Sequence, residues 1–394
     1  MARPLNIAHC VESYAPALGG MPEVVKQLSE RLVRMGHRVT VFTSHHDQRD
    51  YTEHNGVRIR SYQLSGNAVN GIVGDPAPYL SDLKQGHFDV TTFFAAQQWS
   101  ADAVLPHLDE LTAKKVFVPT GFSSLHDPRY AAYYAEMPKW LAGMDLNVFL
   151  SHRYRDIDMA RANGLSNHTV IPNGAAAEEF DEQAVMDMRA ELAIGPKQSL
   201  LLHLGSYTGI KGHKEAIRIF LAANTGHAVL VLAGNGNLHL KHFFEHHWRY
   251  FTLRWSAQLK KKRIVFIEPD RARTVALMKQ ADLFLFPSQV ECSPIVLFES
   301  MAAGVPFLAS QAGNSQEITE WSNGGWTIPG STDANERQHV DVRAGAKLLS
   351  ALIAEPERLH SVGQAGRDAW KKQFTWQRIA EQYAEQYQLL VGHG

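Results

Sequence analysis

The feature that most limits how this sequence can fold is the alternation of short apolar runs with helical patterns. An apolar run at residues 5–8 is followed by a break at Gly19-Gly20 and then by apolar residues at helical spacing up to Gly36. Such alternation is typical of parallel sheets joined by crossover helices. The sequence therefore predicts an α/β fold.

The predicted strands form two series, which indicates two domains. A chain of 394 residues also exceeds what one hydrophobic core usually fills. The first series comprises residues 5–8, 38–43, 57–62, 116–119, 146–151 and 169–171, and the second comprises residues 200–204, 228–233, 263–267, 283–286 and 306–309. We expect Rossmann-like domains at 1–175 and 195–373, with parallel sheets facing each other across a deep cleft that holds the ligands. Residues 376–394 contain a last amphipathic helix that we expect to pack back on the first domain.

Composition excludes several classes of protein. A formal charge of −1 offers no overall case for nucleic-acid binding, so we expect no nucleic-acid partner. Two cysteines far apart in sequence, Cys10 and Cys292, argue against a disulfide framework. Neither a signal peptide nor a run of about 18 apolar residues is visible, and we expect a cytoplasmic protein.

The segment at residues 291–304, ECSPIVLFESMAAG, is predicted to be a loop that enters a helix. Ser293 would be the N-cap, Pro294 the first helical residue and Gly304 the stop. Free N–H groups at the start of such a helix favour a bound phosphate. The acids Glu291 and Glu299 lie on either side of this position, where ionised carboxylates would accept hydrogen bonds from the hydroxyls of an extended ligand such as a nucleotide sugar. The alternative is that Glu291 is a solvated loop residue and Glu299 forms an internal ion pair.

Two glycine-containing loops add to this pattern. The first, residues 204–214, follows a predicted strand and carries Gly205, Ser206 and Lys211, so that a lysine would lie near a leaving diphosphate. The spacing of its glycines and lysine is not the Walker pattern, which argues against a nucleoside triphosphatase. The alternative to a phosphate-binding loop is an ordinary tight turn. The second, Gly19-Gly20, lacks the full G-x-G-x-x-G pattern, which disfavours a dinucleotide dehydrogenase.

Taken together, these segments resemble family 4 of the GT-B glycosyltransferases, whose signature is two glutamates separated by seven residues. The resemblance spans nearly the whole chain. It includes, in order, Gly19-Gly20, VIPNG at 170–174, Lys211-Gly212, FPS at 286–288, residues 291–299, AAGVP at 302–306 and FTW at 374–376.

The resemblance implies roles for single residues. Glu291 would hold hydroxyls of the donor sugar, Glu299 those of the ribose, and Lys211 would neutralise the diphosphate. The backbone amides of Ile295, Val296 and Leu297 would complete the phosphate site, and Gly19 and Gly20 would close over it. The resemblance also implies retention of anomeric configuration, a UDP- or GDP-sugar as co-substrate, no cofactor and no metal.

The acceptor implied by the resemblance is a saccharide or a lipid-linked molecule in surface polysaccharide or glycoconjugate synthesis. The chain departs from the family pattern at Ser206, where members commonly have an arginine, and we consider His213 or Lys214 as substitutes. It also lacks the usual histidine near residues 118–121, for which His126 is the candidate catalytic replacement.

Residues 239–263 allow further interpretations. The spacing of His239, His242 and His246 could place a metal on one helix face, but a solvated helix surface is the preferred interpretation and no metal site is predicted. Basic and aromatic residues alternate at 248–263. They predict either a peripheral contact with the anionic inner membrane surface or a buried aromatic face with a solvated basic end.

Two other functions stay open at this point. A nucleotide-sugar 2-epimerase would have the same two-domain layout, although no acid–base set for it is evident in the sequence. A catalytically degenerate protein that binds sugar nucleotides is the second alternative, because of the missing arginine and histidine.

Overall fold

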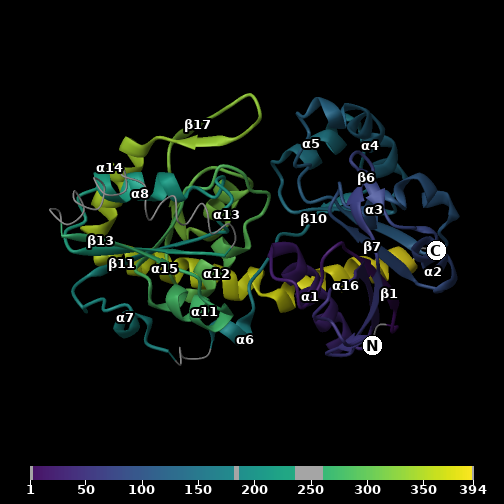
Figure 1. The fold of residues 1–394 in the computed structure, drawn as a ribbon, viewed down its shortest axis with the longest axis horizontal. Helices are drawn as coiled ribbons and strands as arrows, with labels where there is room; N and C mark the ends of the chain where they lie inside the picture. The colour runs from purple at the N-terminus through teal and green to yellow at the C-terminus, as the bar shows by residue number, and fades with distance from the viewer. Residues whose placement is uncertain (1–2, 182–185, 236–260, 393–394) are drawn as a thin grey trace. The chain divides into compact units, whose positions relative to one another are not determined.

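The computed structural model describes residues 3–181, 186–235 and 261–392 (Figure 1). The chain divides into two compact units, one comprising Met1–Asn173 with Trp376–Gly394 and the other Gly174–Thr375. Each unit contains one large sheet built mainly or wholly from parallel strands. The predicted α/β fold with parallel sheets in two domains is confirmed.

The first unit is built on an eight-stranded sheet. Its strands are β1 (Asn6–Cys10), β2 (Arg38–Ser44), β3 (Glu53–His54), β4 (Val57–Tyr62), β7 (Val90–Phe94), β8 (Lys114–Val118), β9 (Leu146–Phe149) and β10 (His168–Val170), and a separate hairpin is formed by β5 (Ser65–Asn67) and β6 (Gly71–Val73). Its helices are α1 (Gly20–Arg34), α2 (Ala77–Gln85), α3 (Trp99–Asp102), α4 (Ala131–Gly143), α5 (Arg155–Ala162) and α16 (Trp376–Gly392). The sheet order is β10-β9-β8-β7-β1-β2-β4-β3, and β3 pairs antiparallel with β4.

Strand β7 lies between β1 and β8 and was missed by the sequence analysis. Its sequence, VTTFF, is fully buried, but Thr91 and Thr92 interrupt the apolar run by which buried strands are recognised. The hydroxyl of Thr92 is satisfied inside the unit, because it lies 2.6 Å from the hydroxyl of Tyr387 in α16. A tertiary contact thus allows a polar residue in a central strand.

Helix α16 packs along α1 within the first unit (Figure 1). It buries one face, formed by Trp376, Ile379, Ala380, Tyr383, Ala384 and Tyr387. The hydroxyl of Tyr387 also lies 3.4 Å from Nε2 of His9 in β1. The last helix of the chain therefore contributes to the core of the first unit.

The second unit is built on a six-stranded parallel sheet with the order β13-β12-β11-β14-β15-β16. These strands are β11 (Ser199–Leu204), β12 (Ala228–Ala233), β13 (Lys262–Ile267), β14 (Leu283–Phe286), β15 (Phe307–Ala309) and β16 (Gly325–Thr327), and β17 (Gly330–Thr332) forms a hairpin with β18 (Gln338–Val340). The helices are α6 (Ala177–Phe180), α7 (Met188–Glu191), α8 (His213–Ala222), α11 (Arg271–Gln280), α12 (Ile295–Ala303), α13 (Ser315–Ser322), α14 (Val342–Ile353) and α15 (Pro356–Ala369).

The strand order of the second unit defines where a ligand is expected. Taken in chain order from β11, the strands lie 3-2-1-4-5-6, the doubly wound arrangement of nucleotide-binding folds. The winding reverses between β11 and β14, and ligands of such sheets bind beyond the carboxyl ends of the strands at this switch point. We therefore expect a ligand-binding site at the loops that follow β11 and β14.

Candidate active site

Lys211 and Glu291 meet at the switch point of the second unit. Lys211 ends the loop after β11, Glu291 lies in the loop after β14, and the Lys211 ammonium donates to Oε1 of Glu291 at 2.7 Å. The hydroxyl of Ser288 donates to the same oxygen, also at 2.7 Å. The side chain of Glu291 is only 9% exposed, whereas that of Lys211 is 29% exposed, so the pair opens to solvent on the lysine side.

Glycines allow these two loops to approach each other. Gly212 has a φ of +79°, and a Cβ at this position would lie 2.1 Å from the carbonyl oxygen of Pro287 in the second loop. A Cβ on Gly205 would lie 2.9 Å from Cβ of Lys211. Because only glycine fits at both positions, the backbone itself places Lys211 beside Glu291.

A turn at residues 313–314, which was not predicted from the sequence, contacts the loop that carries Glu291. The N–H of Asn314 donates to the carbonyl of Cys292 at 2.8 Å. A Cβ on Gly313, whose φ is +59°, would lie 2.4 Å from the same carbonyl. The dipeptide Gly313-Asn314 is a common turn signal, so the turn could have been predicted but not its contact with the loop at residues 291–292.

Helix α12 begins one residue later than predicted. Pro294 has a ψ of 111° and is the N-cap, so Ile295 and not Pro294 is the first helical residue, while Gly304 ends the helix in the left-handed conformation as expected. The prediction followed the general preference of proline for the first helical position, and Pro294 departs from that preference by one residue. The N–H groups of Ile295 and Val296 belong to the first turn, whose amides lack intrahelical acceptors. The Leu297 N–H, in contrast, donates to the carbonyl of Pro294 at 3.1 Å, so this amide already has a partner within the chain.

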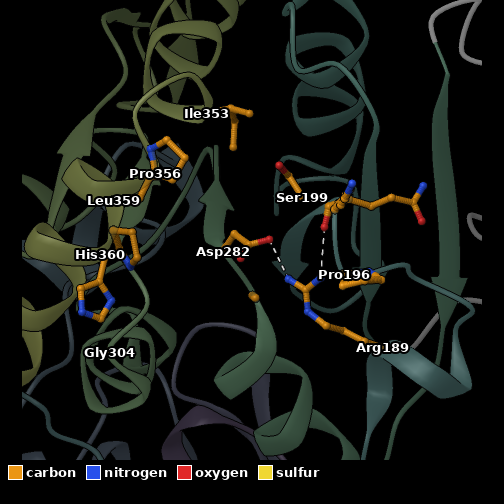
Figure 2. A pocket seen from close by; sticks show the side chains of 13 residues that line it. Arg189, Pro196, Ser199, Asp282, Gly304, Ile353, Pro356, Leu359 and His360 are labelled. Atoms are coloured by element: carbon orange, nitrogen blue, oxygen red, sulfur yellow. Dashed lines mark hydrogen bonds and ion pairs between the residues drawn. The ribbon is translucent and has the colours of Figure 1, made fainter.

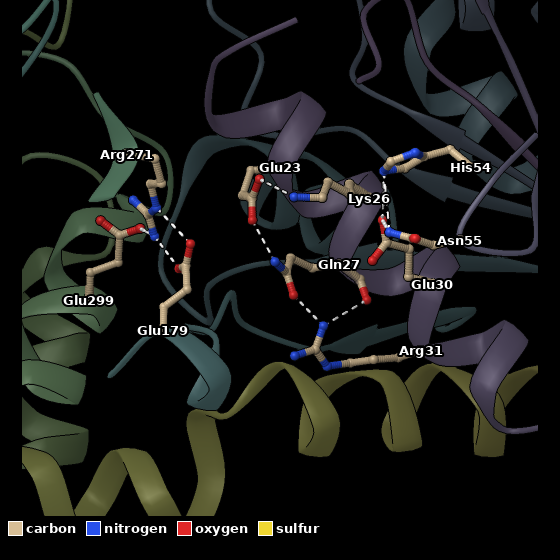
Figure 3. A network of polar contacts seen from close by, with 10 residues as sticks. All are labelled: Glu23, Lys26, Gln27, Glu30, Arg31, His54, Asn55, Glu179, Arg271 and Glu299. Carbon is tan, nitrogen blue, oxygen red and sulfur yellow. Dashed lines mark hydrogen bonds and ion pairs between the residues drawn. The ribbon is translucent and has the colours of Figure 1, made fainter. Parts of the chain in front are cut away.

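Glu299 lies on α12, buried, in an ion pair with Arg271 of α11. Nη2 of Arg271 lies 2.7 Å from Oε1 of Glu299, and the same guanidinium binds Glu179 of α6, with Nε donating to Oε1 at 2.9 Å (Figure 3). Burial disfavours the charged guanidinium, but the carboxylates of Glu299 and Glu179 outweigh it and raise the pKa of Arg271. An internal ion pair was one of the two roles predicted for Glu299, but its partner could not be identified because Arg271 lies far from Glu299 in sequence.

Ser206 and His213 do not supply the positive charge that an arginine would. The hydroxyl of Ser206 is directed at the side chain of Asn235, with 3.3 Å between Oγ and Oδ1. His213 is buried, and burial lowers its pKa to about 4, so it is neutral near pH 7. The hypothesis that His213 replaces the arginine is therefore wrong, whereas Lys214 is exposed and remains a candidate.

In the first unit, Gly19 and Gly20 form the start of α1. Gly19 is the N-cap residue with a φ of 153°, its carbonyl accepts from the N–H of Glu23 at 3.2 Å, and Gly20 is the first helical residue. The pair thus presents the amino end of a helix after β1, at the carboxyl edge of the sheet. That position is typical of an anion-binding loop.

His126 is exposed in the loop after β8, next to a stretch of strained backbone. Thr120 and Phe122 in this loop have positive φ values of 58° and 46°, and Ala95 and Gln97 after β7 both have a φ of 63°. Positive φ costs free energy in non-glycine residues and is often retained at functional sites. The positive φ values of these four residues could not be predicted from the sequence, because none of them is a residue type that commonly adopts left-handed backbone.

A pocket of the second unit lies away from the predicted site residues (Figure 2). It has a volume of about 280 Å³ and is lined at the amino ends of the strands by Ser199, Asp282 and Pro306. Arg189 faces this pocket, but its guanidinium is engaged by Asp282 at 2.7 Å and by the carbonyls of Gln198 and Gln280. The arginine of this pocket therefore serves a structural ion pair, and the pocket is not the site predicted from the sequence.

Several predictions concern residues that the structure does not describe. His239, His242 and His246 fall outside the described residues, as does most of the segment 248–263. Lys262 of that segment is buried at the start of β13, and its ammonium donates to the carbonyls of Phe220 and Ala223 at the end of α8. It is therefore not available to a membrane surface. None of the helices within the described ranges is sufficiently long and apolar to cross a bilayer.

Two protein-family models match consecutive parts of the chain. The model described as Glycosyltransferase Family 4 matches residues 18–179, and the model described as Glycosyl transferases group 1 matches residues 186–368. An uncharacterised glycosyltransferase of Methanocaldococcus jannaschii is 24% identical over 98% of this chain and 99% of its own length. The alpha-maltose-1-phosphate synthase of Mycolicibacterium smegmatis is 32% identical over 28% of each chain.

Solved structures show the same fold. A sucrose-phosphate synthase from Thermosynechococcus elongatus superposes with a TM-score of 0.80 at 19% identity, covering 99% of this chain and 100% of its own. The Anabaena protein HepE in complex with UDP has a TM-score of 0.73 at 16% identity, covering 97% and 99%. These relatives carry glycosyltransferase or synthase names, which does not favour the epimerase alternative. The two family models, together with the fold shared with these structures, identify the chain as a member of the GT-B glycosyltransferases of family 4 (group 1).

Proposed function

We propose that this glycosyltransferase moves a sugar from UDP- or GDP-sugar to a hydroxyl of a saccharide or lipid-linked acceptor, with retention of configuration and without a metal. The observation that carries the proposal is the pair formed by Lys211 and Glu291 at the switch point of the second unit, close in sequence to the amino end of α12. A cation, free amides and a carboxylate are the groups that a diphosphate joined to a polyhydroxylated ring requires.

The chemistry fits the charges that develop during transfer. Departure of the nucleoside diphosphate leaves negative charge on its terminal oxygens, and fixed positive groups stabilise such charge most effectively. Lys211 and the amides of Ile295 and Val296 are such groups, since the first is held by Glu291 and the others belong to a helix. Each group placed in this way contributes a few kcal/mol to catalysis.

The environment of Glu291 favours binding over nucleophilic attack. Its Oε1 accepts hydrogen bonds from an ammonium and a hydroxyl, both of which reduce the nucleophilicity of a carboxylate. We therefore propose that Glu291 accepts hydrogen bonds from donor-sugar hydroxyls and that the acceptor hydroxyl attacks C1 from the face of the departing diphosphate. The bond from C1 to the phosphate oxygen breaks, and the diphosphate takes up the proton of the acceptor hydroxyl. Retention follows from this front-face geometry.

One comparison supports UDP as a candidate nucleotide of the donor. The similar Anabaena structures contain UDP and UDP-glucose. Since their likeness to this chain is one of fold, GDP stays in the proposal beside UDP.

A thermal-shift titration with UDP, GDP and the matching nucleosides tests the proposal. A ligand that binds only the folded protein raises the melting temperature with its concentration. We expect one of the two diphosphates to do so, and we expect the Lys211→Gln variant to bind it at least about tenfold more weakly because a charge-assisted contact is lost.

Lys347→Gln is the matched control, because Lys347 is an exposed lysine on α14 of the same unit and is not placed in the donor site. It should bind the diphosphate like the wild type, and neither variant should change the affinity for the nucleoside. If neither diphosphate raises the melting temperature, or if Lys211→Gln binds as tightly as wild type, the proposed donor site is wrong.

A further inference from the structure

Arg271 is the central member of a three-residue ionic group in the second unit, and the proposed chemistry does not use it. Its guanidinium contacts Glu299 on one side and Glu179 on the other (Figure 3). The three residues come from α11, α12 and α6, so one side chain joins three helices. The group carries a formal charge of −1, because two carboxylates surround one cation.

The position of Arg271 is electrostatically unfavourable for the helix that carries it. Arg271 is the first residue of α11, after the N-cap Asp270. A positive charge at this end opposes the helix dipole, which favours acidic side chains there. Local helix stability therefore does not explain an arginine at this position, whereas its two carboxylate partners do.

The ion pair holds one carboxylate oxygen of Glu299 in a defined place. The ion pair joins Arg271 to Oε1 of Glu299, whose side chain is 7% exposed. A glutamate side chain has several rotatable bonds, and an ion pair at 2.7 Å restricts them. Glu179 fixes the guanidinium in turn, since Nε and Nη2 of Arg271 both bind the Glu179 carboxylate.

We propose that Arg271 is a positioning residue that orients Glu299 for the two ribose hydroxyls of the donor nucleotide and so makes the site selective for ribonucleotides. This inference rests on the proposed function, because it requires a nucleotide at Glu299. Two vicinal hydroxyls can donate to a carboxylate whose orientation is fixed, and loss of these donors leaves a buried acceptor unsatisfied. Selectivity of this kind is absent when the carboxylate is free to turn away.

The test compares UDP and GDP with their 2′,3′-dideoxy counterparts by calorimetry on the full chain. In the wild type, the dideoxy form should bind roughly tenfold or more weakly, the effect of losing hydrogen bonds to a charged group. In Arg271→Gln this ratio should fall toward one because the ribonucleotide loses affinity while the dideoxy form does not. Glu299→Gln should show the same collapse, and Arg271→Lys should restore part of the ratio.

Arg273→Gln is the matched control, since Arg273 lies on the same first turn of α11 but pairs with Glu191 instead. It should keep the wild-type ratio. A wild-type ratio in Arg271→Gln, or tighter ribonucleotide binding in that variant, would overturn the positioning role. Absence of binding by all four nucleotides to the wild type would instead overturn the proposed function, so the two failures can be told apart.

Discussion

His203 and His213 form a buried pair next to the loop that carries Lys211. Their ring centroids are 4.5 Å apart, and Tyr207 packs on His213 at 4.6 Å. Burial lowers the pKa of His203 to about 3 and that of His213 to about 4. Within the part of the chain that the structure describes, Nε2 of each ring is buried without a hydrogen-bond partner. Both imidazoles are therefore held neutral by their surroundings.

This pair predicts a loss of stability in mild acid. The ordinary histidine pKa of 6.5 applies to the unfolded chain, which takes up protons first as the pH falls. The stability is fully present above pH 6.5, and His213 loses its share between that value and about pH 4, by at most about 1.4 kcal/mol per pH unit. Urea unfolding at pH 7, 6 and 5 should show this decrease, and His213→Asn should make the decrease shallower.

His360→Asn controls for the change of residue type, because His360 is an exposed residue of the same unit. Its unfolding free energy should follow the wild-type dependence on pH. An unaltered slope in His213→Asn would mean that His213 is not neutral in the folded protein.

At the scale of elements, the loop between β11 and α8 shows how two glycines with similar backbone differ in their surroundings. Gly209 has a φ of +84°, and a Cβ at this position would have nothing within 4 Å, whereas Gly212 has a φ of +79° and faces the carbonyl of Pro287. The first needs glycine for its backbone conformation only. The second needs it also for the approach of the two site loops.

Alanine at the two positions should therefore have unequal effects. Gly209→Ala should cost about 1–2 kcal/mol of unfolding free energy, the usual penalty for left-handed backbone. Gly212→Ala should cost more and should also weaken binding of the diphosphate, because the loop must move Lys211 away from Glu291. Urea unfolding and calorimetry with UDP and GDP measure both quantities, and equal effects of the two variants would contradict this explanation.

Helix α12 was predicted almost to the residue because its limits are local. Pro294 and Gly304 mark its ends by their own backbone preferences, whatever lies around them. Strand β7 was missed for the opposite reason, since Thr91 and Thr92 are buried by neighbouring elements and not by any property of the run itself. Local rules predict boundaries well and burial poorly.

At the scale of the whole molecule, the end of the chain completes the unit formed by its beginning. Tyr383 of α16 is fully buried in the first unit, whereas Leu389 of the same helix is 46% exposed. The two positions allow the contribution of the buried face to be measured without removing the helix.

Tyr383→Ala should lower the unfolding free energy of the first unit by about 3–5 kcal/mol, as expected for a large buried aromatic residue. Leu389→Ala should change it by no more than about 0.5 kcal/mol. Pulse proteolysis in urea, which can resolve the two units, is the appropriate measurement. Similar values for both variants would mean that α16 contributes little to the core of the first unit.

From the sequence alone we could infer the α/β class of fold, most strands of the two large sheets and the residues that resemble the family signature. Hydrophobic periodicity, prolines and glycines act through neighbouring residues, so they can be interpreted without knowing the fold. Tertiary structure alone decided that Lys211 contacts Glu291, that Arg271 holds Glu299 and that His213 is too deeply buried to carry charge. Such contacts join residues that are distant along the chain, and the free energy of a charge depends on the groups that folding brings around it.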